Sequence, residues 1–178
     1  HLYNSIMRQE TVELVHHTPL NNGLVFNHYN PNSSISYQEI EHDNNDVIAI
    51  KQTGDSGNLA IQYPAHADLS DWFEKGQLIF DIKVMQQEKT SELFVKMGSG
   101  WPRVSDIKLS HLKVGQWQQV RLNIAELINN ANSSYSDPLA KASINNIFSL
   151  FVIEPKGDIE FLVKNIRYEI PEAKTLLP

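Results

Sequence analysis

The most regular stretch of the sequence reads Gly76-Gln77-Leu78-Ile79-Phe80-Asp81-Ile82-Lys83-Val84. Every second residue from Leu78 to Val84 is apolar, whereas Asp81 and Lys83 between them are charged. A period of two is the side-chain period of a β-strand, because successive side chains point to opposite faces. We therefore expect a strand with one face in the core and the other in contact with water.

Similar short runs recur along the chain between Gly, Pro, Asn and Asp turn signals. Many short strands with turns between them predict an all-β protein, and we interpret the chain as an antiparallel β-sandwich of jelly-roll type. With 76–85, the expected strands are 23–29, 34–41, 46–52, 58–63, 91–97, 104–109, 116–123, 147–154 and 158–170.

The segment 147–153 is apolar on both faces, which predicts a central strand covered on both sides. Two short helical pieces are expected as connectors, at 68–73 and 123–129, and the Asn- and Ser-rich stretch 129–138 is expected as a surface loop.

The 178 residues suit one domain, since no repeat or low-complexity linker divides the chain. We expect an irregular lead-in over 1–22, a single β-sandwich domain over 23–170 and a C-terminal tail over 171–178.

Composition excludes several functions. A formal net charge of −6 disfavours nucleic acid and anionic lipid, which bind clustered Lys and Arg. The same sign disfavours sulfated or uronate-rich polysaccharides, so a neutral glycan is the easier partner. The chain has no cysteine, which rules out disulfides, thiolate metal sites and a thiol nucleophile. No apolar run is long enough to cross a membrane.

The loop Met97-Gly98-Ser99-Gly100-Trp101-Pro102-Arg103 contains the main candidate binding residues. Its glycines and proline place Trp101 in a turn, where a side chain is hard to bury. An indole can stack on the C–H face of a sugar ring, and the Arg103 guanidinium can bind a pair of hydroxyls. The alternatives are core packing for Trp101 and a solvated surface position for Arg103.

The order of several motifs resembles that of galactose-binding-like β-sandwich domains, and most closely that of the C-terminal domain of ExoP-type family 3 glucan exohydrolases. These motifs are Ala67-Asp68-Leu69-Ser70, the strand from Leu78 to Val84, the Met97–Arg103 loop, Gly115-Gln116-Trp117-Gln118-Gln119-Val120 and the Phe161–Ile166 segment. The resemblance covers roughly residues 23–170.

The resemblance implies a jelly roll that is accessory to a secreted, periplasmic or cell-surface bacterial enzyme acting on polysaccharides. It also implies a sugar site on a concave face or in rim loops, and often a structural calcium ion.

Other aromatic residues are secondary candidates for stacking on a ligand. Tyr37 and Trp117 are included among the ligand-binding residues, although the resemblance favours a packing role for Trp117. If Val120 points inward, the period of two sends Trp117 to the opposite face. Tyr29, Tyr63 and Tyr135 are weaker candidates, and Trp72 is expected to be a hinge or core anchor.

A metal site is less clearly indicated. The stretch Glu41-His42-Asp43-Asn44-Asn45-Asp46 offers oxygen ligands for calcium, with Asp43 and Asp46 as weak candidates, but it also suits an ordinary acidic turn. The seven histidines show no zinc-binding spacing.

No catalytic motif is present in the sequence, so we expect no enzymatic activity. The function expected is non-catalytic binding of a neutral polysaccharide, a β-glucan or a galactan such as agar. Two alternatives stay open: a docking domain of a glycoside hydrolase with no sugar site of its own, and a small β-sandwich lyase or hydrolase.

Overall fold

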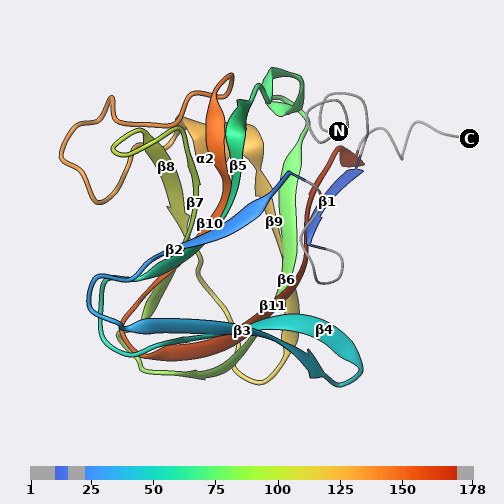
Figure 1. The fold of residues 1–178 in the computed structure, drawn as a ribbon, viewed down its shortest axis with the longest axis vertical. Coiled ribbons are helices and arrows are strands. Elements are labelled where there is room, and N and C mark those ends of the chain that lie inside the picture. The colour runs from blue at the N-terminus through green and yellow to red at the C-terminus, as the bar shows by residue number, and fades with distance from the viewer. Residues whose placement is uncertain (1–10, 16–22, 172–178) are drawn as a thin grey trace, which may run out of the picture.

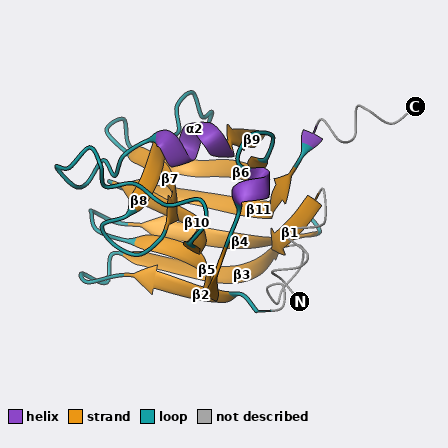
Figure 2. Ribbon diagram, turned by 90° about the horizontal axis from the view of Figure 1, so that it is seen from above, coloured by secondary structure: helices purple, strands orange, loops and turns teal. Residues whose placement is uncertain are grey.

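The computed structural model describes residues 11–15 and 23–171 of the chain. Two β-sheets pack face to face, and every pairing between their named strands is antiparallel (Figures 1 and 2). The all-β sandwich predicted from the sequence is therefore confirmed.

The five-stranded sheet has the order β2-β5-β10-β7-β8. Its strands are β2 (Val25–Tyr29), β5 (Asn58–Ala67), β10 (Ile147–Lys156), β7 (Glu92–Gly98) and β8 (Val104–Lys108). β10 occupies the centre of this sheet, as its apolar sequence predicts.

The six-stranded sheet has the order β3-β4-β11-β6-β9, and β1 pairs with the end of β11. Its strands are β3 (Ile35–His42), β4 (Asn45–Gln52), β11 (Ile159–Glu169), β6 (Gln77–Gln87), β9 (Trp117–Asn123) and β1 (Thr11–Val15). A 3₁₀ turn, η1 (Ser70–Trp72), and a short helix, α2 (Ile124–Asn129), connect strands where helical pieces were expected.

The inner faces of both sheets form one hydrophobic core. Phe80 of β6 meets Phe151 of β10 with ring centroids 5.2 Å apart in an edge-to-face arrangement. Trp72 is buried against Tyr168, which confirms it as a core anchor. The Tyr168 hydroxyl donates a 2.6 Å hydrogen bond to the Leu150 carbonyl, and this bond links the two sheets.

One expectation for the lead-in is wrong. Residues 11–15 are not irregular but form β1, which pairs with residues 166–169 of β11. Leu14 from this strand is fully buried in the core. The short run has little periodicity of its own, so its conformation comes from a partner about 150 residues away in the chain. The rest of the lead-in and residues 172–178 lie outside the described residues.

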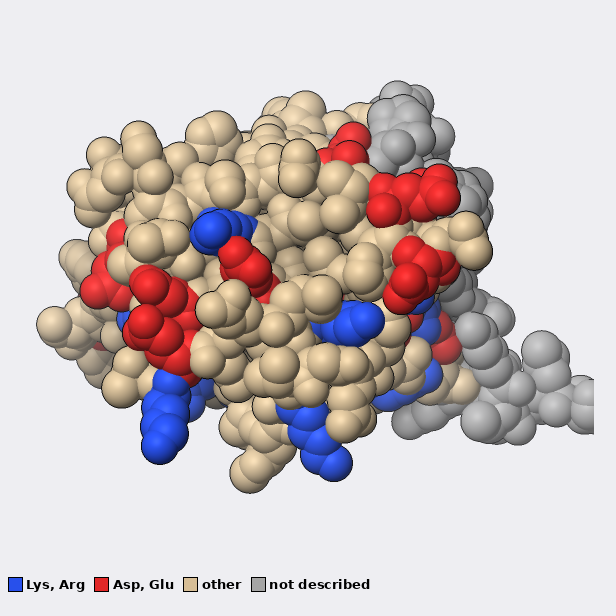
Figure 3. Space-filling view, turned by 90° about the horizontal axis from the view of Figure 1, so that it is seen from below, with Lys and Arg blue, Asp and Glu red and all other residues tan. Residues whose placement is uncertain are grey.

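Charged side chains of both signs are mixed on the surface. On the face shown in Figure 3, acidic and basic groups lie interspersed and form no single basic patch. In the described part of the chain, no helix is long and apolar enough to span a membrane.

Candidate functional site

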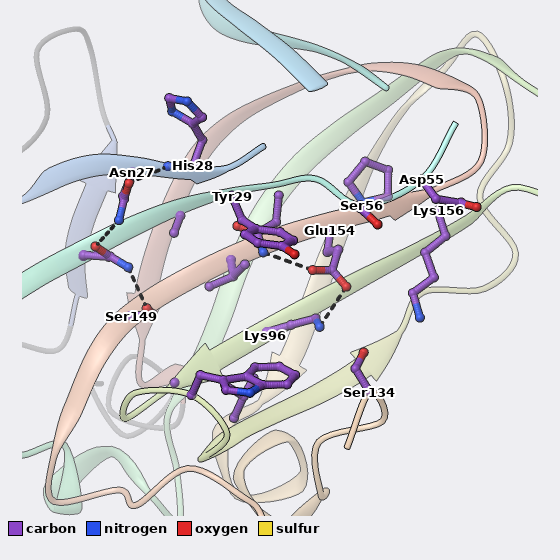
Figure 4. A pocket seen from close by; sticks show the side chains of 18 of the residues that line it. Asn27, His28, Tyr29, Asp55, Ser56, Lys96, Ser134, Ser149, Glu154 and Lys156 are labelled. Carbon is purple, nitrogen blue, oxygen red and sulfur yellow. Dashed lines mark hydrogen bonds and ion pairs between the residues drawn. The ribbon is translucent and has the colours of Figure 1, made fainter. Parts of the chain in front are cut away.

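A hollow of about 1200 Å³ lies on the outward face of the five-stranded sheet (Figure 4). Because side chains alternate along a strand, the residues between the core positions of β5, β10 and β7 point into this hollow. We call it the groove. It is lined from β2 on one side to the β7–β8 loop on the other.

Small residues make the floor of the groove low. Ala60 on β5 pairs with Val152 on β10. Three residues earlier on β10, Ser149 pairs with Gly98 on β7. Ala60, Val152 and Ser149 are each less than a tenth exposed. At these positions, a ligand can approach close to the sheet.

Lys96 is a buried cation in this floor. It is 4% exposed, and its Nζ lies 2.9 Å from Glu154 Oε2 and 3.8 Å from Asp106 Oδ2. Asp106 also accepts hydrogen bonds from the amide and hydroxyl of Ser133, at 3.1 and 2.7 Å. The ion pairs hold the Glu154 carboxylate in one position, because leaving a buried charge without a partner costs several kcal/mol.

Two sets of polar side chains present hydrogen-bonding groups to the groove (Figure 4). Asn58 Nδ2 donates to Glu154 Oε1 at 3.0 Å. Asn27 donates to Gln62 at 3.1 Å, and Gln62 donates to the Ser149 hydroxyl at 3.2 Å. A carboxylate has about four acceptor positions, so Glu154 keeps capacity for further donors such as sugar hydroxyls.

Trp101 lies at the rim of the groove, in the β7–β8 loop. Its side chain is 64% exposed, in agreement with the turn position predicted from its glycine and proline neighbours. The loop closes through a 2.8 Å hydrogen bond from the Arg103 amide to the Gly100 carbonyl, and Gly100 has a φ of +106°. Tyr135 meets the indole edge-on, with ring centroids 6.0 Å apart.

The loop that carries Trp101 is braced by the long connection before β10. The Ser143 amide donates to Ser99 Oγ at 2.9 Å, and the Asn132 side chain donates to the Pro102 carbonyl at 3.0 Å. The Arg103 guanidinium donates to the Ser143 hydroxyl. A loop held by these bonds presents its indole in a fixed position, which lowers the entropy cost of binding.

The predicted ligand-binding residues do not lie together in the structure. Trp101 lines the groove, and so does Tyr29, which is 55% exposed on β2. Arg103 is not among the lining residues, because its side chain is directed to Ser143. Tyr37 is half-buried between the sheets, with ring centroids 5.7 Å from Phe26 and 6.0 Å from His28.

Trp117 lies on the other sheet. It is half-buried on the outward face of β9, where Lys164 Nζ lies 4.2 Å from its ring centroid. Of the weaker candidates, Tyr63 is buried in the core, and Tyr135 contacts Trp101 as described above.

Several groove residues were not identified from the sequence, namely Asn27, Asn58, Gln62, Lys96, Ser149 and Glu154. Their only sequence signal is a polar residue within an apolar strand, such as Lys96 in Leu93-Phe94-Val95-Lys96-Met97.

The predicted calcium ligands lie at a tight hairpin turn. Asp43 and Asn44 have φ of +51° and +64° and join β3 to β4 as a two-residue turn, which explains the choice of Asp and Asn there. The Asp43 carboxylate lies 3.2 Å from His42 and 4.0 Å from Lys83. Among the described residues, no group of three or more acidic or histidine side chains is placed to hold a metal ion, and calcium binding at Asp43 and Asp46 stays a prediction.

The charges at the groove are largely paired. Lys96 has its two carboxylates, Glu92 forms a 3.2 Å ion pair with Lys108, and Lys156 lies over the Phe94 ring at 4.7 Å. Without a strong field of either sign, the groove suits an uncharged ligand.

The family model Exop_C, described as galactose-binding domain-like, matches residues 14–168. The chain belongs to this family, which confirms the resemblance seen in the sequence. No curated protein matches the chain.

Solved structures share the fold at low sequence identity. The extra C-terminal domain (X) of exo-1,3/1,4-β-glucanase (ExoP) from a Pseudoalteromonas species has a TM-score of 0.65 at 9% identity, with 89% of this chain and 91% of that chain covered. The whole ExoP enzyme gives 0.63 at 10% identity, with 85% of this chain and 19% of that chain covered.

The family 11 carbohydrate-binding module from Clostridium thermocellum, in complex with a β-1,3-1,4-mixed-linked tetrasaccharide, gives a TM-score of 0.61 at 13% identity. The match covers 89% of this chain and 95% of that chain.

Proposed function

We propose that this domain binds a neutral polysaccharide, a β-glucan or a galactan such as agar, in the groove of the five-stranded sheet. The observation that carries the proposal is the exposed Trp101 indole at the rim of the groove that also contains the fixed hydrogen-bonding groups of Glu154 and Asn58. The indole stacks on the apolar face of a sugar ring, and the polar groups bind its hydroxyls.

We further propose that the domain is non-catalytic and accessory to a carbohydrate-active enzyme that is secreted, periplasmic or at the cell surface of a bacterium. The similar domain in ExoP is a small part of a larger glucanase, which supports this role. Tethering raises the local concentration of substrate around a catalytic domain without new contacts in the catalytic site. Glu154, the carboxylate that lines the groove near Lys96, is paired with this buried cation, which suits binding better than acid–base chemistry.

The first test is affinity electrophoresis through gels that contain mixed-linkage β-glucan or agarose. We expect Trp101→Ala to lose retention, with affinity reduced by about 2 kcal/mol, roughly thirtyfold, the loss typical of an aromatic hot-spot residue. Trp117→Ala is the matched control, because it removes the same side chain from the opposite sheet. Thermal unfolding should stay near wild type for Trp101→Ala, since its side chain is exposed.

Retention of Trp101→Ala equal to that of wild type would exclude this residue from the site. Wild-type protein that is retained by no polysaccharide of a broad neutral panel would reject the proposed function. The docking alternative would then become the better explanation of the fold.

A further inference from the structure

At the Trp101 end of the groove, β5 contains a large irregularity. Ile147 of β10 pairs with Ala67, but Ser149 pairs with Gln62. β10 thus advances two residues (149 − 147) while β5 advances five (67 − 62). The three extra residues of β5 bulge out of the ladder, and such bulges redirect side chains, often next to binding sites.

The bulge places His66 over Phe148. The residues 64–66 are exposed, and His66 has a φ of +61°, a conformation that is costly for a residue other than glycine. The two ring centroids are 5.0 Å apart, with an interplanar angle of 32°. Phe148 lines the groove.

Core packing does not account for this pair. Phe148 is half-buried and belongs neither to the buried core nor to the residues packed on it. His66 Nδ1 lies 2.8 Å from Asn146 Oδ1, so Nδ1–H donates to the amide oxygen. In the neutral imidazole this leaves Nε2 as an acceptor. The Phe148 ring supplies an aromatic face and the His66 imidazole supplies an acceptor, the same two kinds of group that Trp101 and Glu154 supply elsewhere in the groove.

We infer that His66 and Phe148 form a second sugar-binding subsite, so that the groove takes a polysaccharide chain along its length. This inference rests on the proposed function. Ser149 and Glu154 lie opposite Gly98 and Phe94 of β7, which are four residues apart, so Phe148 lies about 16 Å from Glu154 at about 3.3 Å per residue. A ligand that contacts both places must be a chain of several sugar units, and a short oligosaccharide can occupy only one.

The test is isothermal titration with a disaccharide, a tetrasaccharide and a hexasaccharide from whichever glycan, mixed-linkage β-glucan or agarose, retains the wild type. We expect Phe148→Ala and His66→Ala to weaken hexasaccharide binding roughly two- to tenfold, the worth of one aromatic contact. Disaccharide binding should be unchanged in both variants, whereas Asn58→Ala, at the Glu154 end of the groove, should weaken binding at every length.

Two controls separate the subsite from folding. Phe148→Tyr keeps the flat ring and should keep hexasaccharide affinity. His66 is exposed, so His66→Ala carries the test even if Phe148→Ala does not fold, as judged by thermal unfolding.

Each other outcome has a distinct meaning. Wild-type hexasaccharide affinity in both alanine variants would reject the subsite and leave the groove function standing. An equal loss at every chain length would place Phe148 in the same site as Asn58 and Glu154 and would also reject a separate subsite. Wild-type protein that binds neither glycan would overturn the proposed function, and this inference with it.

Discussion

Replacing Lys96 by Met should destabilise the domain strongly, although the new side chain has a similar length. Lys96 is 4% exposed and neutralises Glu154 at 2.9 Å and Asp106 at 3.8 Å. Removing one member of a buried ion pair typically costs about 3–5 kcal/mol, because the remaining charge is left without compensation. Asn58 and Ser133 still donate to the two carboxylates, so we expect the lower end, about 3 kcal/mol.

Lys51→Met provides the matched control. Lys51 also lies on a strand and pairs with a glutamate, Glu160, at 3.1 Å, but its side chain is 61% exposed. An exposed ion pair contributes at most about 1 kcal/mol. The two substitutions therefore change the same chemical groups at nearly the same distance and differ mainly in burial.

Urea unfolding measures both effects. We expect a lower midpoint for Lys96→Met with an unchanged slope, and a melting temperature reduced by roughly 6–12 °C for a domain of this size. Adding Glu154→Gln should restore part of the loss, because it removes one uncompensated charge. Equal and small losses for Lys96→Met and Lys51→Met would refute the reasoning, since they would show that the groove cation is not held by buried carboxylates.

Two further substitutions test the core. Tyr168→Phe should cost about 1–3 kcal/mol at neutral pH, because the Leu150 carbonyl loses its donor. Burial raises the pKa of Tyr168 well above its usual value near 10. As the pH rises above about 10, the unfolded chain therefore loses the hydroxyl proton before the folded protein does. The free energy of unfolding falls with each further rise in pH. The wild type should therefore lose about 1.4 kcal/mol more per pH unit than Tyr168→Phe above that pH in urea unfolding, and parallel curves would contradict this. Gly76→Ala should cost about 1–3 kcal/mol, because its Cβ would lie 2.4 Å from the Trp72 carbonyl oxygen, and an unchanged melting temperature would show that the turn can relax.

Much of the fold could be predicted from local pattern. The run from Leu78 to Val84 alternates as a half-buried strand should, and its apolar residues are indeed buried. The doubly apolar segment 147–153 is central as predicted, but its outward face is not covered by a further layer, since Phe148, Ser149 and Val152 line the groove. β1 was missed, since its partner in β11 lies at the other end of the chain.

The site was harder to predict, because it depends on which strands become neighbours. The exposure of Trp101 could be predicted, because the neighbouring Gly100 and Pro102 indicate a turn. Tyr37 is a strand residue whose direction depends on packing between the two sheets, and Arg103 is bound to Ser143, forty residues away. Glu154 and Lys96 meet only because β10 and β7 pair, and no local pattern encodes that pairing.

The most direct test of the account follows the three tryptophan indole N–H signals by nuclear magnetic resonance during titration with a hexasaccharide of mixed-linkage β-glucan or agarose. Trp101 is at the groove, Trp117 is on the opposite sheet and Trp72 is in the core. The account predicts that the Trp101 signal shifts with saturation while the other two stay in place. A saturable shift of Trp117 with Trp101 unmoved would contradict the account and would place binding on the six-stranded sheet.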